Sequence, residues 1–473
     1  MLKSLRKILS LQLKDCIKKR SEHGTNLVAV QLPNCNVCVE ENKRCNCNHI
    51  VVEDRKNTTA VEGANFDAEH DANADSSFVQ AVINMVGMLI GLGQLSTPYA
   101  VEKGGWASTL LLIGLGVMCA YTSHILGKCL ENNPNLTSYV DIGNQAFGSK
   151  GRYLVATFIY MEIFMALVSY TISLHDNLII VFLGTHLKLK LAMLSTSQIL
   201  TLVAILIALP SLWIRDMSSI SFLSTGGILM SLLIFMCVAV TAIFGDVQAN
   251  NHSIPAFKLH NIPSISGLYV FGYGGHIVFP DLYKAMKDPS KFTKVSIVSF
   301  TIVTALYTSM GLMGAKMFGN NVQSQITLNM PPNQIITKIA LWATVLTPMT
   351  KYALEFAPFA IQLEHSLPNS LSGRTKLVIR GCVASFLLLT ILTLALSVPY
   401  FEHVLSLTGS LVSVAICLIF PCAFYMKIFW GKITRPLLVL NVFLVMFGFL
   451  LGVMGTISST ELILKKFLSH HST

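Results

Sequence analysis

Residues 87–99 read Gly-Met-Leu-Ile-Gly-Leu-Gly-Gln-Leu-Ser-Thr-Pro-Tyr, and residues 271–281 read Phe-Gly-Tyr-Gly-Gly-His-Ile-Val-Phe-Pro-Asp. In each stretch a glycine stands five residues before a proline (Gly93 and Pro98; Gly275 and Pro280). Glycine permits non-helical backbone, and proline suits the first turn of a helix that restarts. Both stretches lie within longer apolar segments, so the pattern predicts two membrane helices that are interrupted midway.

The composition around these stretches is that of a membrane protein. The chain has 473 residues, of which 53% are hydrophobic and 12% are charged, and its mean hydropathy is +0.60. A soluble protein carries about a quarter charged residues. The deficit of charge argues against a soluble enzyme.

The net charge of +10 would by itself suit a nucleic-acid-binding protein. Residues 1–76, however, hold 11 Lys/Arg and 11 Asp/Glu, whereas the remaining 397 residues hold 23 basic and 13 acidic groups. The whole surplus therefore falls in the apolar part of the chain. This distribution argues for a membrane domain with a charged N-terminal tail and against nucleic acid as a partner.

Eleven segments from Ser77 onward are long and apolar enough to span a bilayer, which takes about 20 residues. They predict an all-α integral membrane protein of about 11 transmembrane helices. The predicted spans are 77–101, 106–128, 152–183, 196–214, 217–245, 265–284, 293–317, 335–362, 377–399, 403–428 and 435–459.

The distribution of basic residues predicts the orientation of these spans. With the N-terminus in the cytosol, cytosolic segments collect 25 of the 34 Lys/Arg and the opposite side collects eight. In this topology the Asn-x-Ser/Thr sites at Asn57 and Asn135 are cytosolic. Only Asn251 is then expected to be glycosylated.

The two breaks lie in spans one and six, which are five spans apart. Unwound backbone at membrane depth is tolerated only where it is buried or lines a cavity, and it attracts carboxylate and ammonium groups. Paired breaks indicate an inverted-repeat transporter with its site at the midplane. The alternative to broken helices is that these glycines only allow neighbouring helices to pack closely. The predicted divisions are a tail (1–76), repeat one (77–250), repeat two (263–430) and a last helix (431–473).

Four stretches resemble a known family: residues 84–93 with Pro98-Tyr99, 139–148, 274–289 and 350–358. They are similar to the amino acid/auxin permease family, and most closely to its plant vacuolar amino acid transporter branch. The resemblance covers about residues 77–459. It implies a leucine-transporter-like fold and proton-linked transport of amino acids.

Ionisable groups inside spans usually face the interior of a helix bundle. Glu162 lies about ten residues into span three, near mid-bilayer, and is a candidate for proton exchange or for a structural hydrogen bond. His276 lies in the break of span six, where it could titrate with substrate or pack as a satisfied core residue. His175 and Asp176 lie near the far end of span three, where interfacial solvation is favoured over a gate contact.

Lys351 lies inside span eight, and Glu355 follows one helical turn later. In sodium-coupled members of this fold class a cation bridges spans one and eight. We expect the ammonium of Lys351 to occupy that place, to reach the carbonyls near Gly91 and to replace sodium. A simple buried ion pair with Glu355 is the alternative.

The substrate is expected to lie between the two breaks. Backbone at Gly91, Leu92 and Gly93 would hold its carboxylate, and backbone at Gly272, Tyr273, Gly274 and Gly275 would hold its ammonium. The side chains expected to face this point are Asn84, Gln94, Tyr160, Tyr273 and Thr350. No further charged residue is expected there to pair with a charged side chain of the substrate, so neutral amino acids are the favoured substrates.

The tail contains Cys35, Cys38, Cys45 and Cys47, followed by His49. Four thiolates and an imidazole could form a small zinc site, although the Cys-x-Cys spacing of the second pair is tighter than usual. Plain cytosolic thiols are the favoured interpretation, and no other cofactor is expected. Residues 57–76 are predicted to be a disordered linker.

The sequence features predict a membrane carrier without enzymatic activity, and the resemblance implies that it is a proton-coupled carrier of amino acids in a vacuolar membrane. Its expected partners are amino acids, protons and membrane lipid. Two alternatives stay open: a plasma-membrane permease for auxin or a related solute, and a receptor of the same fold that senses amino acids.

Overall fold

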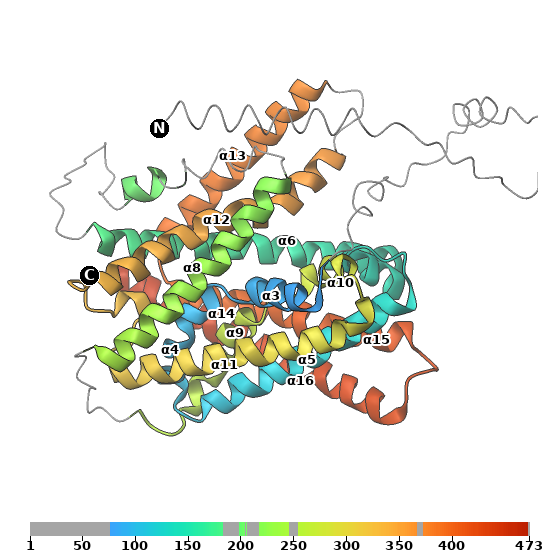
Figure 1. Ribbon diagram of the computed structural model, residues 1–473, viewed down its shortest axis with the longest axis horizontal. Coiled ribbons are helices and arrows are strands. Elements are labelled where there is room, and N and C mark those ends of the chain that lie inside the picture. The colour runs from blue at the N-terminus through green and yellow to red at the C-terminus, as the bar shows by residue number, and fades with distance from the viewer. Residues whose placement is uncertain are drawn as a thin grey trace, which may run out of the picture. The chain divides into compact units, whose positions relative to one another are not determined.

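The computed structural model describes residues 76–182, 198–203, 205, 217–245, 254–366 and 372–471. All regular secondary structure in this part of the chain is helical, apart from one isolated β-bridge between Ser76 and Met286. The long helices, labelled as in Figure 1, are α3 (Phe78–Leu89), α4 (Leu92–Gly104), α5 (Ser108–Asn132), α6 (Tyr139–Val181), α8 (Met217–Phe244), α9 (Ile262–Gly272), α11 (Phe292–Phe318), α12 (Ile335–Ser366), α13 (Gly373–Ser397), α14 (Phe401–Thr408), α15 (Phe420–Ile428) and α16 (Arg435–His471). Short helices are η2 (His276–Val278) and α10 (Phe279–Ala285), and two π-helical turns, η6 (Gly409–Ser413) and η7 (Ala415–Ile419), join α14 to α15.

These helices occupy ten of the eleven predicted spans; the fourth, 196–214, lies mostly outside the described residues. Within the described part of the chain, seven helices are long and apolar enough to cross a membrane, or eight if α3 and α4 count as one bent span. Large apolar side chains such as Phe386 (72% exposed) and Met446 (64%) cover the outer faces of α13 and α16. Apolar surface on this scale suits lipid rather than water.

Both predicted interruptions are present. Span one divides into α3 and α4 with a bend of 58° between them, and span six divides into α9, η2 and α10. The prediction that each proline lies in the first turn of a restarted helix is confirmed for Pro280 in α10 and wrong for Pro98, which lies in the interior of α4. Pro98 is accommodated there because Gly314 of α11 leaves room for its ring.

The glycines that begin the restarted segments do not act through unusual backbone angles. Gly91 has φ −165° and Gly275 has φ −169°, which are extended values open to any residue. Left-handed glycines occur elsewhere, at Gly105, Gly148, Gly319 and Gly431. At the breaks, the absence of a side chain matters because other groups approach closely.

Span three is longer than predicted. Its helix begins at Tyr139, where the side chains of Ser138 and Asp141 form a reciprocal N-terminal cap. Gly148, with φ +64° and ψ −157°, then breaks the helical path before the predicted start at residue 152. The last span also continues to His471, twelve residues beyond the predicted end.

Two sets of helices make extensive contacts, and further contacts, such as that of α11 with α8, join the two sets (Figure 1). In one, α11 packs against α3, α4 and α5, and α4 packs against α9. In the other, α12 packs against α6 and α8, and α13 packs against α6. This all-α bundle, in which the first and sixth spans are interrupted, has the leucine-transporter-like fold that the resemblance implied.

Candidate functional site

The two interrupted spans touch directly at their breaks. A Cβ at Gly93, near the start of α4, would lie 2.5 Å from the Cα of Gly272 at the end of α9. Carbon atoms that are not bonded normally stay about 3.5–4.0 Å apart. Only glycine at position 93 therefore allows the two half-helices to meet.

Tyr307 of α11 joins both breaks. Its hydroxyl lies 2.8 Å from the carbonyl oxygen of Leu89, at the end of α3, and 3.0 Å from that of Gly272. A phenol has one proton to donate and shares it between these acceptors. The helix breaks leave these carbonyl groups without their usual helical hydrogen bonds. The side chain of Tyr307 partly replaces those bonds.

Lys351 reaches the break of span one. Its Nζ donates a hydrogen bond of 3.0 Å to the carbonyl oxygen of Ile90, and a Cβ at Gly91 would lie 3.1 Å from this Nζ. Glu355, one turn further along α12, is close enough for the two charges to interact. The contact expected from the sequence is present, since an ammonium from span eight lies on a free carbonyl of span one.

Glu162 of α6 lies beside the break of span six. Its Oε1 accepts a hydrogen bond of 2.8 Å from the Oγ of Ser413 in η6, and a Cβ at Gly274 would lie 3.4 Å from the same oxygen. Its Oε2 is buried without a hydrogen-bond partner among the described residues. Glu355 of α12 also interacts with it electrostatically. A carboxyl group placed in this way has one oxygen held and one available to a proton.

The π-helical part of span ten closes the other side of this break. Cys417 in η7 lies close enough to the backbone N–H groups of Gly275 and His276 for its thiol to interact with them electrostatically, and η7 packs against η2. These N–H groups belong to the restarting half of span six. Neither Ser413 nor Cys417 was singled out in the sequence, because each lies in an apolar run without a charge, glycine or proline pattern that points at the break.

His276 is fully buried but turns away from the break. Its Nε2 lies 3.0 Å from Thr122 Oγ1 and 3.3 Å from the carbonyl oxygen of Cys119, both in α5. Because a carbonyl only accepts, Nε2 carries the proton, and Nδ1 is left without a partner among the described residues. The ring also packs on Phe279 with 4.8 Å between the ring centroids. This position supports the interpretation of His276 as a packing residue.

Several side chains expected around the substrate instead contact neighbouring helices. The hydroxyl of Tyr273 lies 3.0 Å from Thr304 Oγ1. Gln94 donates from Nε2 to the carbonyl oxygen of Ser231 in α8 at 2.9 Å. Thr350 donates to the carbonyl oxygen of Thr347 in its own helix and lies against Gly227 of α8. Leu92 is buried in α4, whereas Asn84 and Tyr160 are half-buried in α3 and α6.

At the other end of α4 lies a network of charges and polar groups. Glu102, which is 2% exposed, forms ion pairs with Lys258 at 3.1 Å and with Lys103 at 2.9 Å.

Asp176, near the end of α6, has a partner within the protein. Its Oδ2 accepts a hydrogen bond from Gln325, in the segment between α11 and α12. His175 likewise bonds Thr201 at 2.9 Å. Interfacial solvation alone therefore does not describe His175 and Asp176, and whether they form a gate contact stays a prediction.

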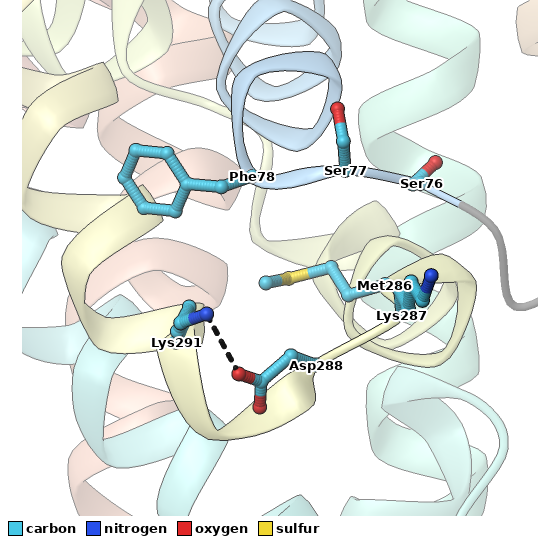
Figure 2. A pocket seen from close by; sticks show the side chains of 7 residues that line it. All are labelled: Ser76, Ser77, Phe78, Met286, Lys287, Asp288 and Lys291. Carbon is cyan, nitrogen blue, oxygen red and sulfur yellow. Dashed lines mark ion pairs between the residues drawn. The ribbon is translucent and has the colours of Figure 1, made fainter.

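A small cavity of about 110 Å³ lies where α3 begins and α10 ends (Figure 2). Its lining includes Ser76, Met286 and an ion pair of 3.0 Å between Asp288 and Lys291. The backbone N–H of Ser76 donates to the carbonyl of Ala285, and the N–H of Lys287 donates to the carbonyl of Ser76. The cavity is therefore bounded by a clasp between spans one and six rather than by the breaks themselves.

The predictions for the tail lie outside the described residues. They include the candidate zinc ligands Cys35, Cys38, Cys45 and Cys47, the sequon at Asn57 and the linker. The sequon at Asn251 is also outside them, whereas Asn135 is exposed between α5 and α6. Across the described ranges, no three His, Cys, Asp or Glu side chains are grouped closely enough to hold a metal ion.

Two interrupted helices that meet at their breaks, with ionisable groups from neighbouring spans beside them, define a multi-pass membrane carrier of the broken-helix class. Comparison with known proteins agrees with this class. Residues 74–461 match the family described as "Transmembrane amino acid transporter protein", and the chain belongs to this family.

Two relatives from Arabidopsis thaliana cover most of the chain. "Amino acid transporter AVT1H" is 59% identical over 440 residues, which span 92% of this chain and 99% of the relative. "Amino acid transporter AVT1E" is 39% identical over 389 residues, which span 82% of this chain and 73% of the relative. Among solved structures, MhsT in complex with L-phenylalanine aligns over 79% of this chain and 98% of its own, with a TM-score of 0.46 and 11% identity. The relatives are named as transporters and not as enzymes, as the sequence led us to expect.

Proposed function

We propose that this chain is a proton-coupled secondary transporter of neutral amino acids that works by alternating access. The observation that carries the proposal is the meeting of the two broken spans, where the ammonium of Lys351 lies 3.0 Å from the carbonyl oxygen of Ile90. Membership of the amino acid transporter family supports the substrate class. Alternating access would involve the rocking of one set of helices against another around the breaks.

The proposed substrate cradle consists mainly of backbone. Gly91 has no side-chain cap, so the N–H groups at the start of α4 are directed toward the break and suit a carboxylate. The carbonyls at the end of α9 suit the ammonium group of the same molecule. Such a site would bind only the carboxylate and ammonium groups that all amino acids share. Because it has no further charged residue to pair with a charged side chain, it favours neutral amino acids.

Glu162 is the proposed proton-exchanging group. It lies at the break of span six, one of its oxygens is buried without a partner among the described residues, and Glu355 is near enough to interact with it. Ionisable residues within spans commonly carry protons in transporters. Proton exchange at Glu162 would then be linked to movement of the restarted half of span six.

Lys351 is proposed to take the place that a sodium ion holds in related carriers. Its ammonium links span eight to span one, so a separate metal cation is not needed between them. A double variant separates this role from a simple ion pair with Glu355. If Lys351 only neutralises Glu355, Lys351→Met with Glu355→Gln restores transport that Lys351→Met abolishes. If Lys351 links the spans, the double variant stays inactive.

The vacuolar membrane is the proposed location, with the N-terminus in the cytosol. The resemblance to the plant vacuolar amino acid transporter branch supports the location, and the Lys/Arg distribution supports the orientation. We also propose residues 77–250 and 263–430 as the two repeats, with residues 1–76 as the tail and residues 431–473 as the last helix and terminus.

The test is transport by the purified chain in proteoliposomes, with an imposed pH gradient of either sign, with and without sodium, and with a panel of labelled amino acids. We expect accumulation of neutral amino acids that follows the pH gradient and does not need sodium. Gly275→Val should abolish this flux while membrane insertion persists. Binding without counterflow would indicate a receptor, and sodium-dependent uptake without a pH response would overturn the proposal.

A further inference from the structure

Span ten is not an ordinary α-helix where it passes the break of span six. In η6 and η7 the backbone hydrogen bonds run to the fifth preceding residue, as from the N–H of Val414 to the carbonyl of Gly409 and from Phe420 to Ala415. π-helical turns are rare, usually occur singly and are frequent at functional sites. Two in succession in one span therefore call for a physical reason.

Close packing and one hydrogen bond hold these turns in place. A Cβ at Gly409 would lie 1.8 Å from the carbonyl oxygen of Gly267 in α9, so span ten abuts span six at this level. The hydroxyl of Tyr139 donates to the carbonyl oxygen of Ile416 at 2.7 Å, which satisfies an acceptor within η7. The irregular backbone is thus stabilised by residues of spans three and six.

The extra residue in a π-helical turn changes where side chains point. In an α-helix, one residue corresponds to about 100° of rotation about the axis. Ser413 is the last residue of η6, and its hydroxyl donates a hydrogen bond of 2.8 Å to Glu162 Oε1. The same hydroxyl also lies 3.5 Å from the carbonyl oxygen of Thr408 in span ten. Ser410, three residues earlier in the same turn, instead bonds the carbonyl of Ser406 within span ten.

We propose that Ser413 is the positioning residue of the proton site: its hydroxyl, presented by the π-helical turn, holds the Glu162 carboxyl at the break of span six. This inference rests on the proposed function of Glu162 as the proton-exchanging group. A hydroxyl that donates to a carboxylate favours the charged form of that group. Ser413 would therefore set the pH at which Glu162 takes up its proton and the direction in which the carboxyl points.

The other ionisable groups around Glu162 do not donate a hydrogen bond to it in the described part of the chain. Glu355 of α12, Tyr139 of α6 and Cys417 of η7 interact with it electrostatically. Lys351 acts on Glu355, and the ring of His276 is bonded to α5. Ser413 is thus the group whose removal changes the hydrogen bonding of Glu162 without adding or removing a charge.

The test compares the pH dependence of initial uptake rates in proteoliposomes for the wild type and for variants at Ser413. Ser413→Ala should move the midpoint of the profile by about one pH unit toward higher pH, because a carboxylate without its donor is protonated more easily. Ser413→Thr, which keeps the hydroxyl, should retain the wild-type midpoint. Ser413→Cys, whose thiol is a weaker donor, should shift it less and in the same direction.

Ser410→Ala is the matched control, since it removes a hydroxyl from the same π-helical turn that does not reach Glu162. A wild-type midpoint for this control, with a shifted one for Ser413→Ala, supports the inference. A uniform loss of rate in Ser413→Ala at every pH, with an unmoved midpoint, would show a merely structural role and overturn it. An equal shift in Ser410→Ala would also overturn it.

The same experiment separates the two levels of the argument. If the wild type responds to the pH gradient and Glu162→Gln removes that response, the proposed function stands and Ser413 is judged on its own. If the wild type transports without any response to pH, the proton-coupled function fails, and the role of Ser413 fails with it.

Discussion

Replacing Gly93 with alanine tests whether direct contact between the broken spans is needed for transport. The added Cβ would lie 2.5 Å from Gly272 Cα, which is backbone and cannot rotate away. Restoring a normal carbon–carbon distance of about 3.5 Å requires the two half-helices to separate by roughly 1 Å. Tyr307, whose hydroxyl bonds Leu89 at 2.8 Å and Gly272 at 3.0 Å, then loses one of its acceptors.

The cost can be worked from these two effects. Overpacking of a close contact costs about 1–3 kcal/mol, and loss of a hydrogen bond costs about 0.5–1.5 kcal/mol. A total on the order of 2–4 kcal/mol disfavours the conformation in which the breaks meet by roughly 30- to 700-fold. We therefore expect transport to fall at least tenfold.

The assay is counterflow of a labelled amino acid in proteoliposomes, normalised to the amount of folded protein from size-exclusion chromatography. Two other glycines give a graded series. A Cβ at Gly272 would meet Tyr307 Cε2 at 3.1 Å, and a Cβ at Gly114 of α5 would meet only Met118 Cε at 3.9 Å. Activity should decrease in the order Gly114→Ala, Gly272→Ala, Gly93→Ala. If Gly93→Ala transports as well as Gly114→Ala, the direct contact does not matter for function.

Three further perturbations follow from the contacts around the two spans. Tyr307→Phe removes the hydroxyl shared by Leu89 and Gly272, so the free energy of unfolding should fall by about 1–2 kcal/mol in a thermal-shift or denaturant assay; an unchanged stability would mean that water replaces this group. Lys287→Pro removes the N–H that donates to Ser76 and should abolish hydrogen-exchange protection of this clasp, whereas Lys287→Ala keeps that N–H and should not. The hydrogen bonds from Ser290 and Lys291 hold the pKa of Asp288 below its usual value of 3.8. Any stabilisation from Asp288 is therefore present above that value and lost only as the pH falls below it, so Asp288→Asn should leave the transport profile between about pH 5 and 8 unchanged; a shifted midpoint would contradict this assignment.

The spans and the two interruptions could be predicted because both depend on local chemistry. A stretch of about 20 apolar residues spans a bilayer whatever its neighbours are. The prediction that Lys351 reaches the carbonyls near Gly91 needed more than local chemistry, because it rested on the cation that bridges spans one and eight in sodium-coupled members of the fold class. The role of the break glycines was predicted less well: Gly91 and Gly275 have extended backbone, and Gly93 is needed because Gly272 lies against it.

The side chains around the site were harder to predict. Tyr273 and Gln94 lie next to the breaks in the sequence, yet they bond to Thr304 and to Ser231 on other helices. A helix presents a new direction with every residue, by about 100°, so adjacency to a break does not decide which side chains face it. That choice depends on which helix packs on which face.

By itself, the sequence determined that this is an all-α membrane protein with broken first and sixth spans and a lysine stranded in the eighth. These features follow from apolar length, from Gly and Pro placement and from the cost of burying a charge. The tertiary structure alone decided that span ten reaches Glu162 beside the break of span six. Ser413 and Glu162 are 251 residues apart, and they meet because a glycine contact with α9 and a hydrogen bond from Tyr139 hold a π-helical turn against the break. Such a turn arises from packing between distant segments and has no local signature in the chain.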